Sequence, residues 1–299
     1  MRDRITVNVP ILIPQPRARV TRIVVAPRGL PQIGAMTATP EQSQGLTLYF
    51  VGFNTALGPW EAAKCAIWAA LTHTTVVTCE IPGFSRYEHH LPARERRDLM
   101  DGDPASLASA TLACLRSAAA KSDLAEPERI DILAYSTGCS LAAAALPAIQ
   151  ASYSVGTMTL IEPVSIISRT LGRLTVHNTA DLIRALKTVP PNIPTSWVRQ
   201  AGLRQFREPK LHFSQADFLA LLCMLTSDDT RTRLKTLDLG PTHLVRGALS
   251  KLCPEGAFDR LDTDLGEREV PGHTSTVAGL GHQLWHCLPA IDALARTLK

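Results

Sequence analysis

A strand-like segment followed directly by a helix-like segment, near the middle of the chain, constrains the fold most. Ile130, Ile132 and Leu133 are apolar and mostly β-branched, which favours a short buried strand. Residues 140–146 consist of small and strongly helix-forming side chains, which favours a closely packed helix. Only Ser136 is left at the junction. We therefore predict a strand, a sharp turn that carries Ser136 and a helix, in direct succession.

The five residues around this turn match a motif that presents a reactive serine. Its usual form is G-x-S-x-G, and the form here is Ala134-Tyr135-Ser136-Thr137-Gly138. The turn pushes the serine hydroxyl outward, so the residues two positions away on either side must be small for strand and helix to pass closely. The helix directs free N–H groups to the place where negative charge would develop. Ser136 is thus a candidate nucleophile, and Tyr135 is either a pocket wall or a packing residue.

The composition is that of an ordinary globular protein. Of 299 residues, 45% are hydrophobic and 19% are charged, which argues against a disordered or fibrous chain. This length suffices for one α/β domain with insertions, so we expect residues 1–299 to form a single domain. The net charge of +4 is scattered, and no block of Lys and Arg is interleaved with aromatic residues. We therefore expect no binding of nucleic acid.

No segment has the pattern of a secretory or membrane protein. The first residues lack the apolar core and cleavage site of a signal peptide, and no apolar run is long enough to span a bilayer. We therefore expect a cytoplasmic location and no membrane span. The seven cysteines are widely spaced and lack a C-x-x-C pair, so we expect them to be reduced and mostly buried.

The pattern of expected elements changes along the chain. The opening strands, with a turn-rich segment at residues 27–44, have no helices between them, which suggests antiparallel pairing at one side of a sheet. Helices and strands then alternate, which favours a parallel sheet with helices on both faces. The expected strands are at residues 5–13, 20–26, 46–51, 74–80, 130–134, 157–161 and 243–248, and the main helices are at 59–71, 104–120, 140–146 and 289–298.

Residues 169–239 contain no strand pattern. They hold helix-like pieces at residues 179–187, 194–206 and 214–225, and helices inserted over a sheet are typical of a lid. We therefore expect a helical lid at residues 164–239, after the sixth strand. Its large apolar side chains would wall a pocket over Ser136: Trp197, Phe206, Phe213, Phe218, Leu219 and Leu222. Four basic residues would face solvent or meet an acidic substrate: Arg199, Arg204, Arg207 and Lys210.

Four segments, in the same order along the chain, resemble the α/β-hydrolase fold family. Residues 48–54 (LYFVGFN) are similar to its third strand and oxyanion loop, with Val51 where a histidine is usual. Residues 79–86 (CEIPGFSR) resemble the stretch after its fourth strand, and residues 279–282 (GLGH) resemble its catalytic histidine loop. With the Ser136 motif, the resemblance covers nearly the whole chain. It implies a mostly parallel central sheet with helices on both faces.

The resemblance also implies an activity. A serine hydrolase of this fold would cleave an ester, a thioester or a similar small-molecule acyl compound through an acyl-enzyme, without a cofactor. An acyltransferase that uses the same residues is one alternative. A non-catalytic ligand-binding or scaffold protein is another, since Val51 replaces the usual histidine and Ala134 replaces the first glycine of the serine motif.

His282 is the candidate general base. Serine is a poor nucleophile until a base removes its proton, and histidine has a suitable pKa for that task at neutral pH. By the family resemblance, His282 stands after Gly281 in the catalytic histidine loop. His286 lies one helical turn later, but the chain has no H-E-x-x-H motif and no third ligand at that spacing. We therefore expect no metal.

The family carries the acid that orients the histidine at one of two positions. Members of the family usually carry an Asp after the seventh strand, where this chain has Ser250. Other members carry the acid after the sixth strand, where this chain has Glu162. The strands that end at Ser136 and Glu162 are consecutive and separated by one helix, so a right-handed crossover would make them neighbours. We therefore choose Glu162, with these acids as alternatives: Glu255, Asp259, Asp262 and Asp264.

The oxyanion hole of this family consists of backbone N–H groups. By position, the resemblance implies the N–H of Thr137, directly after the nucleophile, and the N–H of Phe53, directly after Gly52. Asn54 is an alternative to Phe53 at this position. We also expect Tyr135 and Asn54 to contact the substrate.

Overall fold

The structure is a computed structural model that describes residues 2–9, 18–53, 55–87, 89–121, 127–188 and 210–298. Its strands form one nine-stranded sheet in the order β1-β9-β8-β7-β6-β4-β5-β3-β2. Their bounds are β1 (Asp3–Val7), β2 (Ala18–Val25), β3 (Ile33–Pro40), β4 (Leu46–Phe50), β5 (Thr75–Cys79), β6 (Arg129–Tyr135), β7 (Ser154–Ile161), β8 (Thr242–Gly247) and β9 (His273–Val277).

The sheet is mostly parallel, as predicted. All neighbours from β1 through β5 in this order run parallel, whereas β3 is antiparallel to both β2 and β5. The antiparallel edge expected for the opening strands is therefore present. The first strand does not belong to it, because β1 lies at the opposite edge and pairs in parallel with β9, with Ile5 beside Ser275.

Strand β3 corrects the prediction of a turn-rich segment at residues 27–44. Its sequence, IGAMTATP, consists mostly of Gly, Ala and Thr and ends in Pro. Gly, Ala and Pro are depleted in strands, so the sequence is a weak signal for one. The structure explains the small residue at position 34: a Cβ there would lie 2.6 Å from Nε of Arg86, which pairs with the buried Glu80. Tertiary packing against this ion pair therefore selects a glycine that weakens the local strand pattern.

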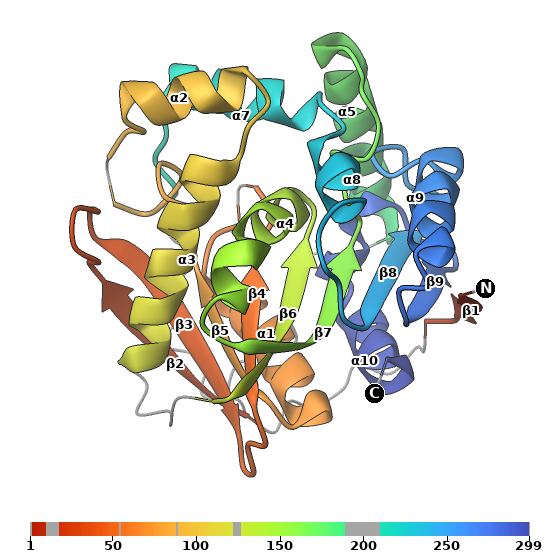
Figure 1. The fold of residues 1–299 in the computed structure, drawn as a ribbon, viewed down its shortest axis with the longest axis horizontal. Coiled ribbons are helices and arrows are strands. Elements are labelled where there is room, and N and C mark those ends of the chain that lie inside the picture. The colour runs from red at the N-terminus through yellow and green to blue at the C-terminus, as the bar shows by residue number, and fades with distance from the viewer. Residues whose placement is uncertain are drawn as a thin grey trace.

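Helices cover both faces of the sheet, as predicted (Figure 1). On one face α1 packs against α10, and on the other α3 packs against α4, which in turn contacts α8. The helices are α1 (Pro59–Thr72), α2 (Ala93–Met100), α3 (Ala105–Ala120), α4 (Thr137–Gln150), α5 (Leu171–Thr188), α7 (Gln215–Leu225), α8 (Asp229–Leu234), α9 (Glu255–Glu267) and α10 (Leu288–Thr297), with a short 3₁₀ helix η2 (His282–His286).

The described part of the predicted lid is helical. Helices α5 and α7 contact each other, and α7 also packs against α2, at the top of the view in Figure 1. Helix α5 begins eight residues before the helix-like piece expected from residue 179. The expected piece at residues 194–206 lies outside the described residues, so a lid that spans residues 164–239 stays a prediction.

The central strands and the helices share one buried apolar core. Every residue of β4, β5 and β8 is buried, which is typical of parallel strands covered on both faces. All seven cysteines are free, and all except Cys223 are buried, as expected. Among the described helices, none combines the length and the apolar character that crossing a membrane requires.

A pair of stacked histidines at the start of β8 and β9 makes stability sensitive to acid. The rings of His243 and His273 lie 5.1 Å apart and nearly parallel, and Nδ1 of His243 accepts from the backbone N–H of His273 at 3.1 Å. Burial, the neighbouring His273 and the charge of Arg2 lower the pKa of His243 to about 4. In the unfolded chain the pKa is about 6.5, so between pH 6.5 and 4 the unfolded state binds more protons.

We therefore expect stability to fall as the pH decreases through this window, with His243 accounting for on the order of 2 kcal/mol. The His243→Asn variant removes the titrating group and offers an amide oxygen as an acceptor for the N–H of His273. Melting temperatures at pH 7 and pH 4.5 should differ less in this variant than in the wild type. Equal pH dependence of the two proteins would contradict the assignment.

Candidate active site

Ser136 occupies a strained corner between β6 and α4. Its backbone has φ 55° and ψ −120°, a conformation that side chains other than glycine adopt rarely. Its N–H donates to the carbonyl of Ile161 at 2.9 Å, which fixes the turn against the neighbouring strand β7. A Cβ at position 138 would lie 2.1 Å from the carbonyl oxygen of Phe50, so glycine is required there. The predicted strand, turn and helix are therefore present, for the predicted steric reason.

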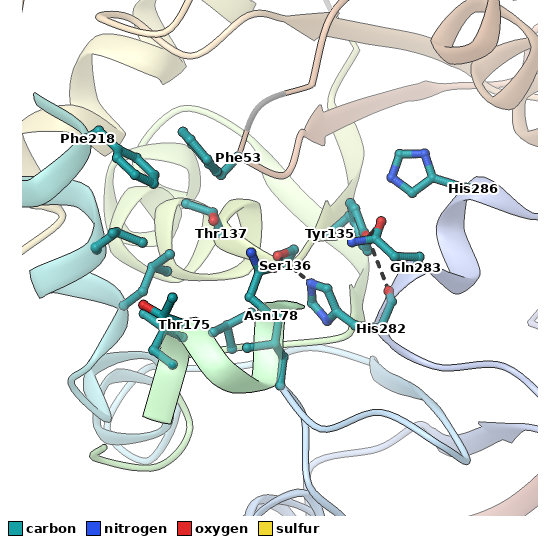
Figure 2. A pocket seen from close by; sticks show the side chains of 15 residues that line it. Phe53, Tyr135, Ser136, Thr137, Thr175, Asn178, Phe218, His282, Gln283 and His286 are labelled. Atoms are coloured by element: carbon teal, nitrogen blue, oxygen red, sulfur yellow. Dashed lines mark hydrogen bonds between the residues drawn. The ribbon is translucent and has the colours of Figure 1, made fainter. Parts of the chain in front are cut away.

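His282 connects Ser136 to Glu162. The Ser136 hydroxyl lies 2.9 Å from Nε2 of His282, and Nδ1 of the same ring lies 2.8 Å from Oε2 of Glu162 (Figure 2 shows the first of these contacts). The three residues are 8%, 3% and 0% exposed, so they are held away from bulk water. The geometry fits an Nδ1–H that donates to the carboxylate and an Nε2 that accepts from the serine.

Glu162 follows β7 directly, next to the strand that carries Ser136. Strands β6 and β7 are parallel neighbours, so both residues lie at the same edge of the sheet. Glu162 also has a positive φ of 54°, which is uncommon for a residue with a side chain. The four alternative acids lie on α9 and pair elsewhere: Glu255 with Arg246, Asp259 with Arg4, Asp262 with Arg2 and Asp264 with Arg231.

The side chain of His282 is buried in the protein. It opens η2, and its ring stacks on Tyr135 at 5.6 Å between centroids. The Tyr135 hydroxyl donates to the backbone carbonyl of His282 at 3.1 Å. Burial and the negative charge of Glu162 hold the pKa of Tyr135 well above its usual value, so the hydroxyl keeps the proton that it donates. Tyr135 thus fixes the segment that carries the candidate base.

Comparison with solved structures identifies the fold. No protein-family model and no curated protein matches the sequence. An esterase of Pyrobaculum calidifontis matches with a TM-score of 0.54 at 20% identity, over 95% of this chain and 86% of its own. A thioesterase domain from the curacin biosynthetic pathway matches with a TM-score of 0.59 at 16% identity, over 93% and 99%. Carboxyl esterase 2 of Tuber melanosporum has a TM-score of 0.53 at 12% identity, over 98% and 89%.

The chain has the α/β-hydrolase fold. At these identities the likeness establishes the architecture and not the substrate. The resemblance noted in the four sequence segments is therefore confirmed at the level of the fold. In this α/β-hydrolase fold, the loops after β4, β6, β7 and β9 meet around Ser136, which is the edge where ligands bind in open α/β sheets.

Thr137 and Phe53, whose backbone N–H groups are predicted to form an oxyanion hole, both line the pocket that contains Ser136. Thr137 is the first residue of α4, so its N–H has no carbonyl one turn earlier to bind. Phe53 follows β4, and its ring lines the same pocket as Ser136. Asn54, the alternative donor and expected substrate contact, lies outside the described residues. The roles of Thr137 and Phe53 in binding an oxyanion stay predictions.

A mostly apolar pocket of about 210 Å³ opens over Ser136. Tyr135, Thr137 and Phe53 line it, as does Phe218 from the predicted lid (Figure 2). Leu222 from the predicted lid lines it as well. Its full lining is Phe53, Tyr135, Ser136, Thr137, Val164, Leu174, Thr175, Asn178, Phe218, Leu222, Leu225, Leu252, His282, Gln283 and His286. Burial and the nearby charge of Lys64 lower the pKa of His286 well below its usual value, so this ring is neutral at neutral pH.

The other described residues that were named in the lid from the sequence are not among the residues that line the pocket. Phe213 packs against the rings of Phe53 and Phe218 and is 39% exposed, and Leu219 is 46% exposed. Lys210 is exposed, as a solvated face requires. The remaining lid residues named from the sequence lie outside the described residues: Trp197, Phe206, Arg199, Arg204 and Arg207.

Sequence reasoning missed several pocket residues. Leu174, Thr175 and Asn178 of α5 line the pocket, and their spacing places them on one face of the helix. That spacing is the signal that could have been used, but the helix was expected to begin later. Gln283 and His286 also line the pocket. His286 was considered only as a metal ligand, because nothing in the sequence indicates that η2 turns this ring toward the pocket.

Proposed function

We propose that the protein is a serine hydrolase that cleaves a carboxylic ester, a thioester or a similar acyl compound. The observation that carries the proposal is the continuous hydrogen-bonded series from Ser136 through His282 to Glu162 at the floor of an apolar pocket. A nucleophile, a base in contact with it and an acid in contact with the base are the three parts that acyl transfer through serine requires. The esterases and the thioesterase that share the fold support the same class of reaction.

The geometry supports the following steps. Nε2 of His282 takes the Ser136 proton as Oγ bonds to the acyl carbon, and the negative charge on the acyl oxygen is held by the N–H groups of Thr137 and Phe53. The protonated ring then gives its proton to the departing alcohol or thiol, which leaves an acyl-enzyme. Water attacks this ester, His282 takes a proton from the water, and Ser136 regains its proton as the acid is released. Glu162 stabilises the charged ring in both halves.

Hydrolysis of p-nitrophenyl esters across a series of acyl chain lengths tests the proposal. We expect the wild type to release nitrophenol and Ser136→Ala to do so at least about 10³-fold more slowly. If Ser136→Ala retains activity within tenfold of the wild type, Ser136 is not the nucleophile. If folded wild-type protein hydrolyses no ester or thioester in the series, the binding-protein alternative replaces the proposal.

The lining of the pocket indicates a neutral substrate. Among the described residues that line it, none is an Asp, Glu, Lys or Arg, and His286 is neutral. Phe218 stacks on Phe53 with 5.3 Å between ring centroids, which forms an apolar wall on one side of Ser136. A charged acyl group would lose its hydration here without gaining a charged partner. We therefore propose that the enzyme prefers esters of uncharged, apolar acids.

Two adjacent residues of α7 offer a matched test of this preference. Phe218 lines the pocket, whereas its neighbour Leu219 does not and is 46% exposed. We expect Phe218→Asp to lower kcat/KM for apolar esters by about 10- to 100-fold, because a bound apolar substrate would cover the new carboxylate and remove its hydration. Leu219→Asp should remain within about threefold of the wild type. Equal losses in the two variants, measured on folded protein, would contradict the assignment of this wall.

A further inference from the structure

Ser250 stands where related folds usually carry the catalytic acid, and it contacts the residue proposed for that role here. It lies three residues after β8 and is 5% exposed. Its hydroxyl donates to Oε2 of Glu162 at 2.6 Å. The same oxygen accepts from Nδ1 of His282 at 2.8 Å. The side chains at positions 162 and 250 therefore meet at one carboxylate oxygen beside the imidazole.

The direction of the serine hydrogen bond follows from its other partner. The backbone N–H of Cys253 donates to Oγ of Ser250 at 3.1 Å. This contact uses a lone pair of the hydroxyl and leaves its proton to point elsewhere. A carboxylate can only accept, so the proton of Ser250 is directed at Glu162.

The second oxygen of Glu162 is fixed by the same loop. Oε1 accepts from the backbone N–H of Gly247, the last residue of β8. Gly247 donates to one oxygen of Glu162 and Ser250 donates to the other. These two hydrogen bonds fix the plane of the carboxylate independently of its contact with the imidazole of His282. A Cβ at position 247 would lie 2.5 Å from the carbonyl oxygen of Gly281, so this loop also packs directly against the segment that carries His282.

The loop is itself anchored to the helix that lines the pocket. Asp181 of α5 is 1% exposed, and its Oδ2 accepts from the backbone N–H groups of Lys251 at 2.9 Å and Leu252 at 3.0 Å. These bonds hold the backbone on the C-terminal side of Ser250, while β8 holds it on the other. Ser250 is thus a rigid donor and not the end of a mobile loop.

We propose that Ser250 is a positioning residue that orients Glu162 toward His282. The proposal rests on the proposed function, because it assigns Glu162 as the acid of the triad. The two positions that can supply this acid in the fold divide the task here. Glu162 supplies the negative charge, and Ser250 supplies a hydrogen bond that orients the carboxylate toward His282.

The first test compares buried serines. Ser250→Ala should lower kcat about tenfold and leave KM within twofold, since one hydrogen bond to a charged group is lost and the pocket is unchanged. Ser250→Thr keeps the hydroxyl and should recover to within about threefold of the wild type. Ser140→Ala is the control, because it removes a buried hydroxyl that contacts Thr230 instead of Glu162. The proposal fails if Ser250→Ala keeps wild-type kcat, or if Ser140→Ala lowers kcat equally.

The second test moves the charge. An Asp side chain reaches one bond farther than Ser, so we expect Ser250→Asp in a Glu162→Gln background to bring a carboxylate toward the Nδ1 of His282 that Glu162 contacts in the wild type. We expect the double variant to be at least tenfold more active than Glu162→Gln alone. A folded double variant that is no more active than Glu162→Gln would contradict the inference that position 250 adjoins the site of the triad carboxylate.

The outcome separates this proposal from the proposed function. If wild type and Ser136→Ala are equally inactive on every ester, the serine hydrolase assignment itself is wrong. If the wild type is active and Ser136→Ala is not, but Ser250→Ala matches the wild type in kcat, only the role of Ser250 is wrong. Melting temperatures of each variant, measured alongside, identify any loss of activity that comes from unfolding.

Discussion

Exchange of Glu162 for Gln is expected to lower kcat by roughly 10³- to 10⁴-fold. The carboxylate accepts from three donors, which are the Nδ1–H of His282, the hydroxyl of Ser250 and the N–H of Gly247. An amide in its place carries an NH₂ group that must oppose at least one of them. It also removes the charge that stabilises the protonated imidazole. Steady-state kinetics with a p-nitrophenyl ester measures the effect.

The acids of α9 are the controls for this prediction. Asp262 is 7% exposed and pairs with Arg2, and Asp259 pairs with Arg4 at the surface, so neither approaches His282. Asp259→Asn, Asp262→Asn and Asp264→Asn should each keep kcat within about threefold of the wild type. A severe loss of kcat in one of these folded variants, with a mild loss in Glu162→Gln, would overturn the choice of acid. The melting temperature of Glu162→Gln should also fall by a few degrees, because a buried N–H is left opposed.

Replacement of Lys64 by Met is expected to destabilise the fold by about 3 to 5 kcal/mol. The ammonium of Lys64 donates to Oε2 of Glu61 at 2.6 Å, and the two side chains are 1% and 2% exposed. Without Lys64, the carboxylate of Glu61 is left buried and unpaired. For a chain of this size, the loss corresponds to a decrease in melting temperature of about 10 °C. Differential scanning calorimetry at neutral pH measures it.

Two further variants isolate the cause. Replacing both partners, with Glu61→Gln and Lys64→Met together, should recover most of the lost stability, because no charge then remains buried without a partner. Asp259→Asn removes one member of an exposed pair with Arg4 and should change stability by less than about 1 kcal/mol. The interpretation is wrong if the double variant is less stable than Lys64→Met, or if Asp259→Asn destabilises the fold as much as Lys64→Met does.

The parts of the fold that follow from local patterns could be predicted from the sequence. Strand β6, the turn at Ser136 and helix α4 are determined by side-chain type over a few residues, and the parallel order of β6 and β7 follows from the helix between them. Strand β3 could not be predicted in this way. Its Gly34 weakens the strand pattern, and that glycine is required by the close approach of Arg86, which is distant in sequence. The place of β1 beside β9 likewise depends on pairing between the two ends of the chain.

The candidate site also has a part that could be predicted from the sequence and a part that could not. Ser136, Glu162 and His282 each follow a strand, so their approach at one edge of the sheet could be inferred from the order of the elements. Their partners could not. The bond between Ser250 and Glu162 depends on how the loop after β8 folds back, and that loop is held by Asp181 from a helix about seventy residues earlier in the chain. Such contacts leave no periodic signal in the sequence.

Covalent labelling of Ser136 by a fluorophosphonate probe tests the central claim most directly. The probe reacts with a serine only when a base activates its hydroxyl, so it reports the contact between Ser136 and His282 without a known substrate. Mass spectrometry of the labelled wild type should place one adduct on the peptide that contains Ser136. Ser136→Ala should carry no adduct, and His282→Ala should be labelled at least about 10²-fold more slowly. Folded wild-type protein that remains unlabelled, or that carries the adduct on another residue, would contradict the assignment of Ser136 as an activated nucleophile.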